Sequence, residues 1–138
     1  MFASLGPVRI PRALVDELIA HAREDVPNEC CGLIGGSDGN AASLYRSINA
    51  EASPLRYSLD AKDQFRIMQA IEDAGEELLA IYHSHTASAP YPSQTDINLA
   101  SYPDAVYLIV SLQDLENPEL RGFWIRDGEV EEAEVEIV

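Results

Sequence analysis

Ile81-Tyr-His-Ser-His-Thr86, with Ser93-Gln-Thr-Asp96 shortly after it, is the stretch of sequence that decides the fold. A β-strand presents residues i and i+2 on one face, so His83 and His85 point to the same side of a sheet. The downstream serine and aspartate have the spacing of residues that share a helical face. Two imidazoles and one carboxylate suit zinc and leave a fourth position open for water, as in a hydrolytic site. The pattern therefore predicts a metal site formed by His83, His85 and Asp96.

Glu29 is the candidate general base, because a catalytic zinc needs a group that takes a proton from its water and is not itself a ligand. It lies in Pro27-Asn-Glu-Cys-Cys-Gly-Leu-Ile-Gly-Gly36, where a helical pattern changes to a short apolar run. The low dielectric at the end of a buried strand raises the pKa of a carboxyl group toward neutrality. An acid beside a helix end is also common without any catalytic role, and that alternative stays open.

The chain resembles the JAMM (MPN-plus, Mov34) metalloprotease family, in which a glutamate precedes the pattern His-Ser-His, seven residues, Ser, two residues, Asp. The positions of this pattern are filled here by Glu29, His83, Ser84, His85, Ser93 and Asp96. The segment Asn49-Ala-Glu-Ala-Ser-Pro-Leu-Arg-Tyr57 is similar to the segment before the second helix in compact bacterial members. Within the family, the chain most resembles the Mec-type sulfur-carrier-protein (CysO)-cysteine peptidases, and the likeness covers nearly its whole length.

The resemblance implies a set of roles for these residues. One zinc ion is bound by His83, His85 and Asp96, Glu29 activates the water, and Ser93 helps to hold the tetrahedral oxyanion. Ser93 also has an acid three residues after it, which is a helix N-cap signature, so a capping role alone is an alternative. Iron or manganese would also accept two histidines and a carboxylate.

By the same resemblance, the enzyme hydrolyses the bond after the C-terminal Gly-Gly of a ubiquitin-like sulfur-carrier protein and releases cysteine for cysteine biosynthesis. Removal of ubiquitin-like modifiers from lysine is the alternative reaction. A non-catalytic scaffold of the same fold is the alternative from another class; such relatives characteristically lack a metal ligand, and this chain lacks none. A zinc deaminase is disfavoured, because neither its His-x-Glu nor its Pro-Cys-x-x-Cys motif occurs in this sequence.

Composition indicates one domain over residues 1–138 that buries a core without disulfides, since 46% of the residues are hydrophobic. The formal net charge of −15 argues against a nucleic-acid partner. No stretch of eighteen or more apolar residues and no leader pattern occurs, so we expect no membrane partner and a cytoplasmic protein. Cys30 and Cys31 are neighbours, which disfavours a disulfide between them and indicates buried thiols in a reducing compartment.

The order of patterns predicts an α/β fold: a mixed sheet sandwiched by helices, with the cytidine-deaminase-like architecture that the resemblance implies. His21 is placed in the first helix as a solvated residue without a role. The first expected elements are an edge strand at 8–10, a helix from Pro11 that ends at Pro27, and strands at 30–34 and 42–48 joined by a turn at 35–40. A second helix is capped by Asp60 and has Phe65, Met68 and Ile71 on its apolar side. Strands at 77–84 and 105–112 follow, with a short helix at 93–100 between them, and the last strands, at 120–126 and 129–138, are joined by a hairpin at Asp127-Gly128.

Overall fold

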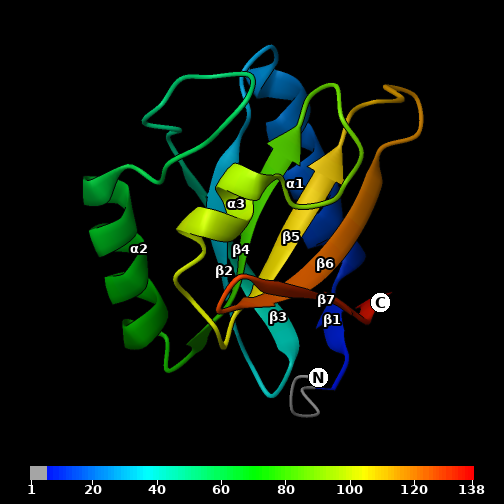
Figure 1. The fold of residues 1–138 in the computed structure, drawn as a ribbon. Coiled ribbons are helices and arrows are strands. Elements are labelled where there is room, and N and C mark those ends of the chain that lie inside the picture. Colours follow the sequence, from blue (N-terminus) through cyan, green and yellow to red (C-terminus); the bar gives the residue numbers. More distant parts are fainter. Residues whose placement is uncertain (1–5) are drawn as a thin grey trace.

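The computed structural model describes residues 6–138 and shows a twisted mixed sheet with helices on both faces (Figure 1). This confirms the α/β class predicted from the sequence. The helices are α1 (Arg12–Asp25), α2 (Ala61–Asp73) and α3 (Gln94–Leu99). The strands are β1 (Val8–Ile10), β2 (Cys31–Ser37), β3 (Asn40–Ser47), β4 (Glu77–His85), β5 (Val106–Ser111), β6 (Glu119–Arg126), β7 (Glu129–Ala133) and β8 (Val135–Ile137).

Strand β4 lies inside the sheet, whose order is β7-β6-β5-β4-β2-β3-β1-β8. It pairs in parallel with β5 and antiparallel with β2, so both of its edges are hydrogen-bonded along most of its length. Strands buried in this way read as nearly continuous apolar runs, as residues 78–82 do. The functional groups of β4 are therefore carried by a rigid central element.

The two faces of β4 contact different helices, because successive side chains of a strand alternate. Ala80 and Tyr82 pack with α1 residues in the larger apolar cluster, whereas Ile81 packs on the opposite face with residues of α3 and of the segments around it. Helix α2 lies over that second face and buries Ile67 and Ile71 against Leu33 of β2 (Figure 1). Because side chains alternate along the strand, His83 and His85 lie on the same face as Ile81.

The strands at the two ends of the sheet, β7 and β8, are joined by Glu134 alone. The sequence predicted a single strand over 129–138, and this prediction was wrong. The sheet coils far enough for Val135 to reach Gly122 of β6, where a Cβ atom would lie 2.8 Å from the Val135 Cγ2. The chain therefore leaves one end of the sheet and enters the other, pairing in parallel with β1. The prediction of β1 as an edge strand was also wrong, because β1 lies between β3 and β8.

The glycine pair of β2 differs from the predicted turn. Gly35 and Gly36 remain in the strand and pair with both neighbours, with a shift of register between them on one side. The turn itself is confined to Asp38 and Gly39, which both have positive φ. A Cβ atom on Gly36 would come within 2.1 Å of the Asn40 carbonyl oxygen, so glycine here permits a bulge and a close backbone approach rather than a chain reversal.

The ends of the helices agree with the sequence signals, but the buried face of α2 differs from the predicted one. Asp60 caps α2, as predicted, by accepting a hydrogen bond from Asp63 N at 3.1 Å. Phe65, predicted on the apolar side of α2, is 76% exposed, whereas Ile71, predicted on the same side, is buried together with Ile67. The hairpin at Asp127-Gly128 is confirmed between β6 and β7.

Within residues 6–138, no helix combines the length and apolar character needed to cross a membrane.

Candidate metal centre

Strand β4 places two histidines on one face and a serine on the other. His83 and His85 are 1% and 4% exposed, and their neighbours across the sheet are Cys31 and Ser111. The intervening Ser84 points to the opposite face, where its hydroxyl accepts a hydrogen bond from Cys30 N at 2.8 Å. The i and i+2 geometry expected from the sequence is confirmed, and Ser84 fixes the backbone one residue after Glu29.

Helix α3 brings Asp96 to the histidines through its N-terminal cap. The Ser93 hydroxyl accepts from Asp96 N at 3.0 Å, and Ser93 N donates to Asp96 Oδ2 at 2.9 Å, which together form a capping box. This reciprocal pair fixes the carboxylate of Asp96, which is 8% exposed. The cap signature read in the sequence is therefore present, and it orients a side chain of the cluster.

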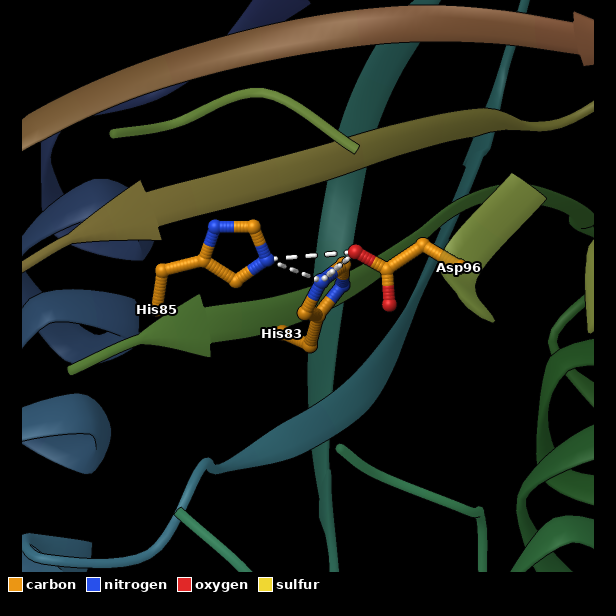
Figure 2. Close-up of side chains that lie close together, drawn as sticks. All are labelled: His83, His85 and Asp96. Carbon is orange, nitrogen blue, oxygen red and sulfur yellow. Dashed lines mark hydrogen bonds and ion pairs between the residues drawn. The ribbon is translucent and has the colours of Figure 1, made fainter. Parts of the chain in front are cut away.

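The three side chains converge on one point (Figure 2). Asp96 Oδ2 lies 3.1 Å from both His83 Nε2 and His85 Nε2, and the two nitrogens are 3.2 Å apart. Burial disfavours ionisation of Asp96, but its hydrogen bonds with the two histidines outweigh burial and hold its pKa well below the usual value. The carboxylate is thus an ionised acceptor inside the protein.

The hydrogen bonds of His85 define which of its atoms is free to bind a ligand. Its Nδ1 lies 2.8 Å from the carbonyl oxygen of Ala89, which can only accept, so Nδ1 carries the proton. In the neutral ring, Nε2 then presents a lone pair toward Asp96 and His83. Acceptors facing one another at about 3 Å need a proton or a cation between them, and a His-His-Asp set is a zinc donor set. The residues present therefore fit a metal ion.

The environment of His83 differs, because Tyr57, to which no role was assigned from the sequence, packs against it. The ring of Tyr57 stacks on the His83 ring with centroids 4.3 Å apart and an interplanar angle of 20°. His83 Nδ1 is buried and has no hydrogen-bond partner among the residues described. Burial lowers the pKa of His83, which favours the neutral ring that a metal requires.

Glu29 faces this cluster from the segment before β2. It is 4% exposed, and burial raises its pKa to about 7, with the charge of His85 opposing the shift and that of Asp96 adding to it. Its Oε1 is buried and has no hydrogen-bond partner within residues 6–138. Its backbone is fixed, since Glu29 N donates to Ser53 O at 2.9 Å and Asn49 Nδ2 donates to Glu29 O at 3.0 Å. The carboxyl group thus has a pKa near neutrality and an oxygen still available for a proton.

One hollow includes a member of the cluster, Asp96, in its lining, and a second hollow includes Glu29. The one next to Asp96 has a volume of about 240 Å³ and the one next to Glu29 about 670 Å³. The first is lined by hydroxyl, amide and apolar groups, among them Tyr57, Gln64, Thr95, Leu99 and Tyr102. The second also includes Asn28, Arg46, Asn49 and Asp63. The cluster is therefore approachable from the hollow beside Asp96.

The prediction that His21 is solvated was wrong. His21 is 5% exposed; its Nδ1 lies 2.7 Å from the Tyr82 hydroxyl, and its Nε2 lies 3.3 Å from Asp25 Oδ2. We call these three residues the His21 cluster. A position in an amphipathic helix does not reveal that a tyrosine from a distant strand will reach it.

Cys30 and Cys31 are buried free thiols, as predicted.

Sequence comparison assigns the chain to a family. A family model described as prokaryotic homologs of the JAB domain matches residues 11–126. The chain belongs to this family. The match confirms the resemblance to the JAMM/MPN metalloproteases read from the motif. It includes β4, α3 and the segment that carries Glu29, so the residues of the candidate metal centre lie within the matched region.

Individual relatives of this JAB protein include two peptidases. It is 47% identical over 127 residues to the CysO-cysteine peptidase of Mycobacterium tuberculosis, covering 91% of this chain and 87% of that protein. It is 42% identical over 103 residues to a desampylase of Haloferax volcanii, covering 70% of this chain and 74% of that one. A solved structure from Desulfitobacterium hafniense matches with a TM-score of 0.86 at 32% identity, covering 95% and 92% of the two chains.

Proposed function

We propose that this protein is a zinc-dependent metallopeptidase that hydrolyses the bond after the C-terminal Gly-Gly of a ubiquitin-like sulfur-carrier protein and releases cysteine. The observation that carries the proposal is the 47% identity, over 91% of the chain, to a CysO-cysteine peptidase. The complete His-His-Asp cluster supports it, because a non-catalytic scaffold does not need three buried side chains whose ligand atoms converge on one point. Two free buried cysteines accord with a reducing, cytoplasmic location.

One zinc ion would be held by His83 Nε2, His85 Nε2 and Asp96. Zinc bound by three protein ligands supplies an acidified water, with a pKa of about 7, and polarises the scissile carbonyl group. The hydrogen bond from His85 Nδ1 to Ala89 O keeps the ring in the tautomer that presents Nε2. The capping box does the same for Asp96 by fixing its carboxylate.

Glu29 would move the protons of the reaction. Its pKa of about 7 allows it to take a proton from the attacking water and to return that proton to the leaving amine. Its unpartnered Oε1 leaves a site for that proton. Because Glu29 is buried beside the cluster and held at both its N–H and its carbonyl group, it does not need to reorganise between the two transfers.

Ser93 would stabilise the oxyanion and cap α3 at the same time. In the cap its oxygen accepts a hydrogen bond from Asp96 N, and the hydroxyl proton is not used by that contact. A serine hydroxyl is one donor as well as an acceptor, so the two roles read from the sequence are compatible. A donor aimed at the developing charge is worth up to about 10²- to 10³-fold in rate.

The test is intact mass spectrometry of a Gly-Gly-terminated sulfur carrier that bears a C-terminal cysteine, incubated with the zinc-loaded protein. Loss of one cysteine residue with the wild type, and not with Glu29→Gln or in the presence of a chelator, is the expected result. An unchanged carrier mass in the presence of zinc-loaded protein contradicts the proposal.

A second candidate reaction is the removal of ubiquitin-like modifiers from lysine side chains. The identity of 42% to the Haloferax volcanii desampylase favours it, although that match covers only 70% of the chain. Both reactions cleave after a terminal glycine and use the same residues. A lysine-linked conjugate placed in the same assay separates them: release from lysine at a rate equal to or above that from the cysteine adduct assigns the desampylase reaction.

A further inference from the structure

We infer that Asn49 is a positioning residue that sets Glu29 relative to His83 through the segment 49–58. This inference rests on the proposed function, in which Glu29 transfers protons beside the metal ligands. We call residues 49–58 the bracket loop. It lies between β3 and α2 and is anchored by a bridge between Asn49 and Leu59.

The side chain of Asn49 uses all of its hydrogen-bonding capacity within this part of the molecule. Its Nδ2 donates to Glu29 O at 3.0 Å and to Arg56 O at 3.1 Å. Its Oδ1 accepts from Glu51 N at 3.0 Å and from Ser58 N at 3.1 Å. The residue is 8% exposed. One buried amide therefore ties both ends of the bracket loop to the backbone of the proposed base.

Glu29 depends on the bracket loop because it precedes the sheet. β2 begins at Cys31, so neither the N–H nor the C=O group of Glu29 is held by a strand partner of β2. Both groups are held by the loop instead: Glu29 N donates to Ser53 O at 2.9 Å, and Glu29 O accepts from Asn49. The position of the Glu29 backbone therefore follows that of the bracket loop.

The far end of the loop contacts the metal ligands. Tyr57 stacks on His83, with ring centroids 4.3 Å apart. In the middle of the loop, Pro54 O accepts a hydrogen bond from the Thr86 hydroxyl at 3.4 Å, one residue beyond His85. The same ten residues thus contact the proposed base on one side and the C-terminal end of β4 on the other.

The separation between the proposed base and the metal ligand His83 therefore depends on the bracket loop. A misplacement of about 1 Å in a reacting group costs on the order of 10²-fold in rate, even when the group itself is unchanged. Asn49→Asp keeps the size of the side chain and both acceptor contacts, but it replaces two donors by a carboxylate oxygen facing the carbonyl groups of Glu29 and Arg56. The substitution should displace Glu29 without touching a metal ligand.

The experiment compares Asn49→Asp with Asn40→Asp in the zinc-loaded protein. Asn40 is the matched control because its Nδ2 also donates to two backbone carbonyl groups, those of Ser37 and Asp38, in a turn at the far end of β2. For Asn49→Asp we expect kcat to fall about 10- to 10²-fold with KM within about 2-fold, one zinc retained per chain, and faster amide exchange at Glu29 N. For Asn40→Asp we expect wild-type values.

A wild type that cleaves the carrier, together with an Asn49→Asp variant whose kcat equals that of Asn40→Asp, overturns the inference while leaving the proposed function intact. A zinc-loaded wild type that cleaves neither adduct overturns the proposed function instead. Should Asn49→Asp fail to fold, Tyr57→Leu tests the other end of the loop and keeps all four Asn49 contacts. We expect kcat at saturating zinc to fall about 10-fold or more, and an unchanged kcat overturns the inference.

Discussion

Two clusters that each pair a buried histidine with an aspartate lie on opposite faces of β4, and only one of them has the properties of a binding site. In the His21 cluster each polar group meets a complementary one, because Asp25 accepts from Nε2 and leaves Nδ1 to accept the Tyr82 hydroxyl proton. In the metal cluster the Nε2 atoms of His83 and His85 and the Oδ2 of Asp96 converge on one point, and His83 Nδ1 and the nearby Glu29 Oε1 have no hydrogen-bond partner among the residues described. The residue types are similar in the two clusters, although the side chain of Asp25 is 37% exposed and that of Asp96 only 6%. Hydrogen-bond satisfaction distinguishes them.

The largest expected difference between the clusters is in metal binding. Asp96→Ala or His83→Ala should lose the zinc and lower kcat by at least about 10³-fold, because two ligands do not retain a catalytic metal. Tyr82→Phe, in the other cluster, should keep one zinc per chain. Metal analysis of the purified variants checks both, and an active zinc-free Asp96→Ala protein contradicts the assignment.

Glu29→Gln should separate binding from chemistry. The amide keeps the shape of the side chain but cannot take a proton, so turnover should fall about 10²- to 10⁴-fold while the zinc content stays at that of the wild type. The measurement is kcat beside metal content in the same preparation. Retained turnover removes Glu29 from the mechanism, and loss of zinc makes it a ligand.

Ser93→Ala should lower kcat by up to about 10²-fold if its hydroxyl proton stabilises the oxyanion. The loss of the cap should also cost about 1 kcal/mol of folding stability. Ser93→Thr is the matched control, since it keeps both the acceptor and the donor. A lower melting temperature with an unchanged rate assigns Ser93 to the cap alone.

Tyr82→Phe should affect stability and leave the chemistry intact. Removing the hydroxyl leaves the buried Nδ1 of His21 without its partner, which should cost about 1–3 kcal/mol in the free energy of unfolding. Urea denaturation of the zinc-loaded protein measures this, with kcat as the control. A variant as stable as the wild type shows that the His21 cluster does not contribute to folding.

The smallest expected effect is a pH dependence of stability caused by His21. Burial lowers the pKa of His21 from 6.5, opposed by Asp25, Glu24 and Glu17 and assisted by Arg46. The unfolded chain therefore binds the proton first, so stability falls as pH decreases through about 6.5 and levels off below the folded-state pKa. The free energy of unfolding of zinc-loaded wild type minus that of His21→Gln, measured from pH 8 to pH 5, should decrease with acid. A constant difference contradicts this account.

The site was largely predictable because its ligands belong to local patterns. Strand alternation gives His83 and His85, and a capping box gives the orientation of Asp96; each depends on only three or four residues of sequence. Tyr57 and Asn49 were missed as contributors, although the segment they bound was noticed, because stacking and side-chain capping of a distant carbonyl group leave no periodic signal. His21 was misread for the same reason: its partner, Tyr82, lies in a strand 61 residues away.

Errors in the fold also came from non-local packing. Phe65 fits the apolar period of α2 as well as Ile67 does, and only the angle at which the helix meets the sheet decides between them. Gly35-Gly36 has the composition of a turn, but neighbours on both sides keep it in β2. Alternating acids in 129–138 indicate a strand, but they do not show where the sheet will coil far enough for the chain to change edges at Glu134.

The joining of the sheet ends through Glu134 has a consequence for the folding of this protein during synthesis. β1 is synthesised before every other strand of the sheet, but one of its two partners, β8, is synthesised after all of them. Until residues 135–137 leave the ribosome, β1 keeps an open edge, which is a template for pairing with other chains. We therefore expect nascent chains stalled before β8 to be prone to aggregation, and a slow final step in which β8 docks beside β1.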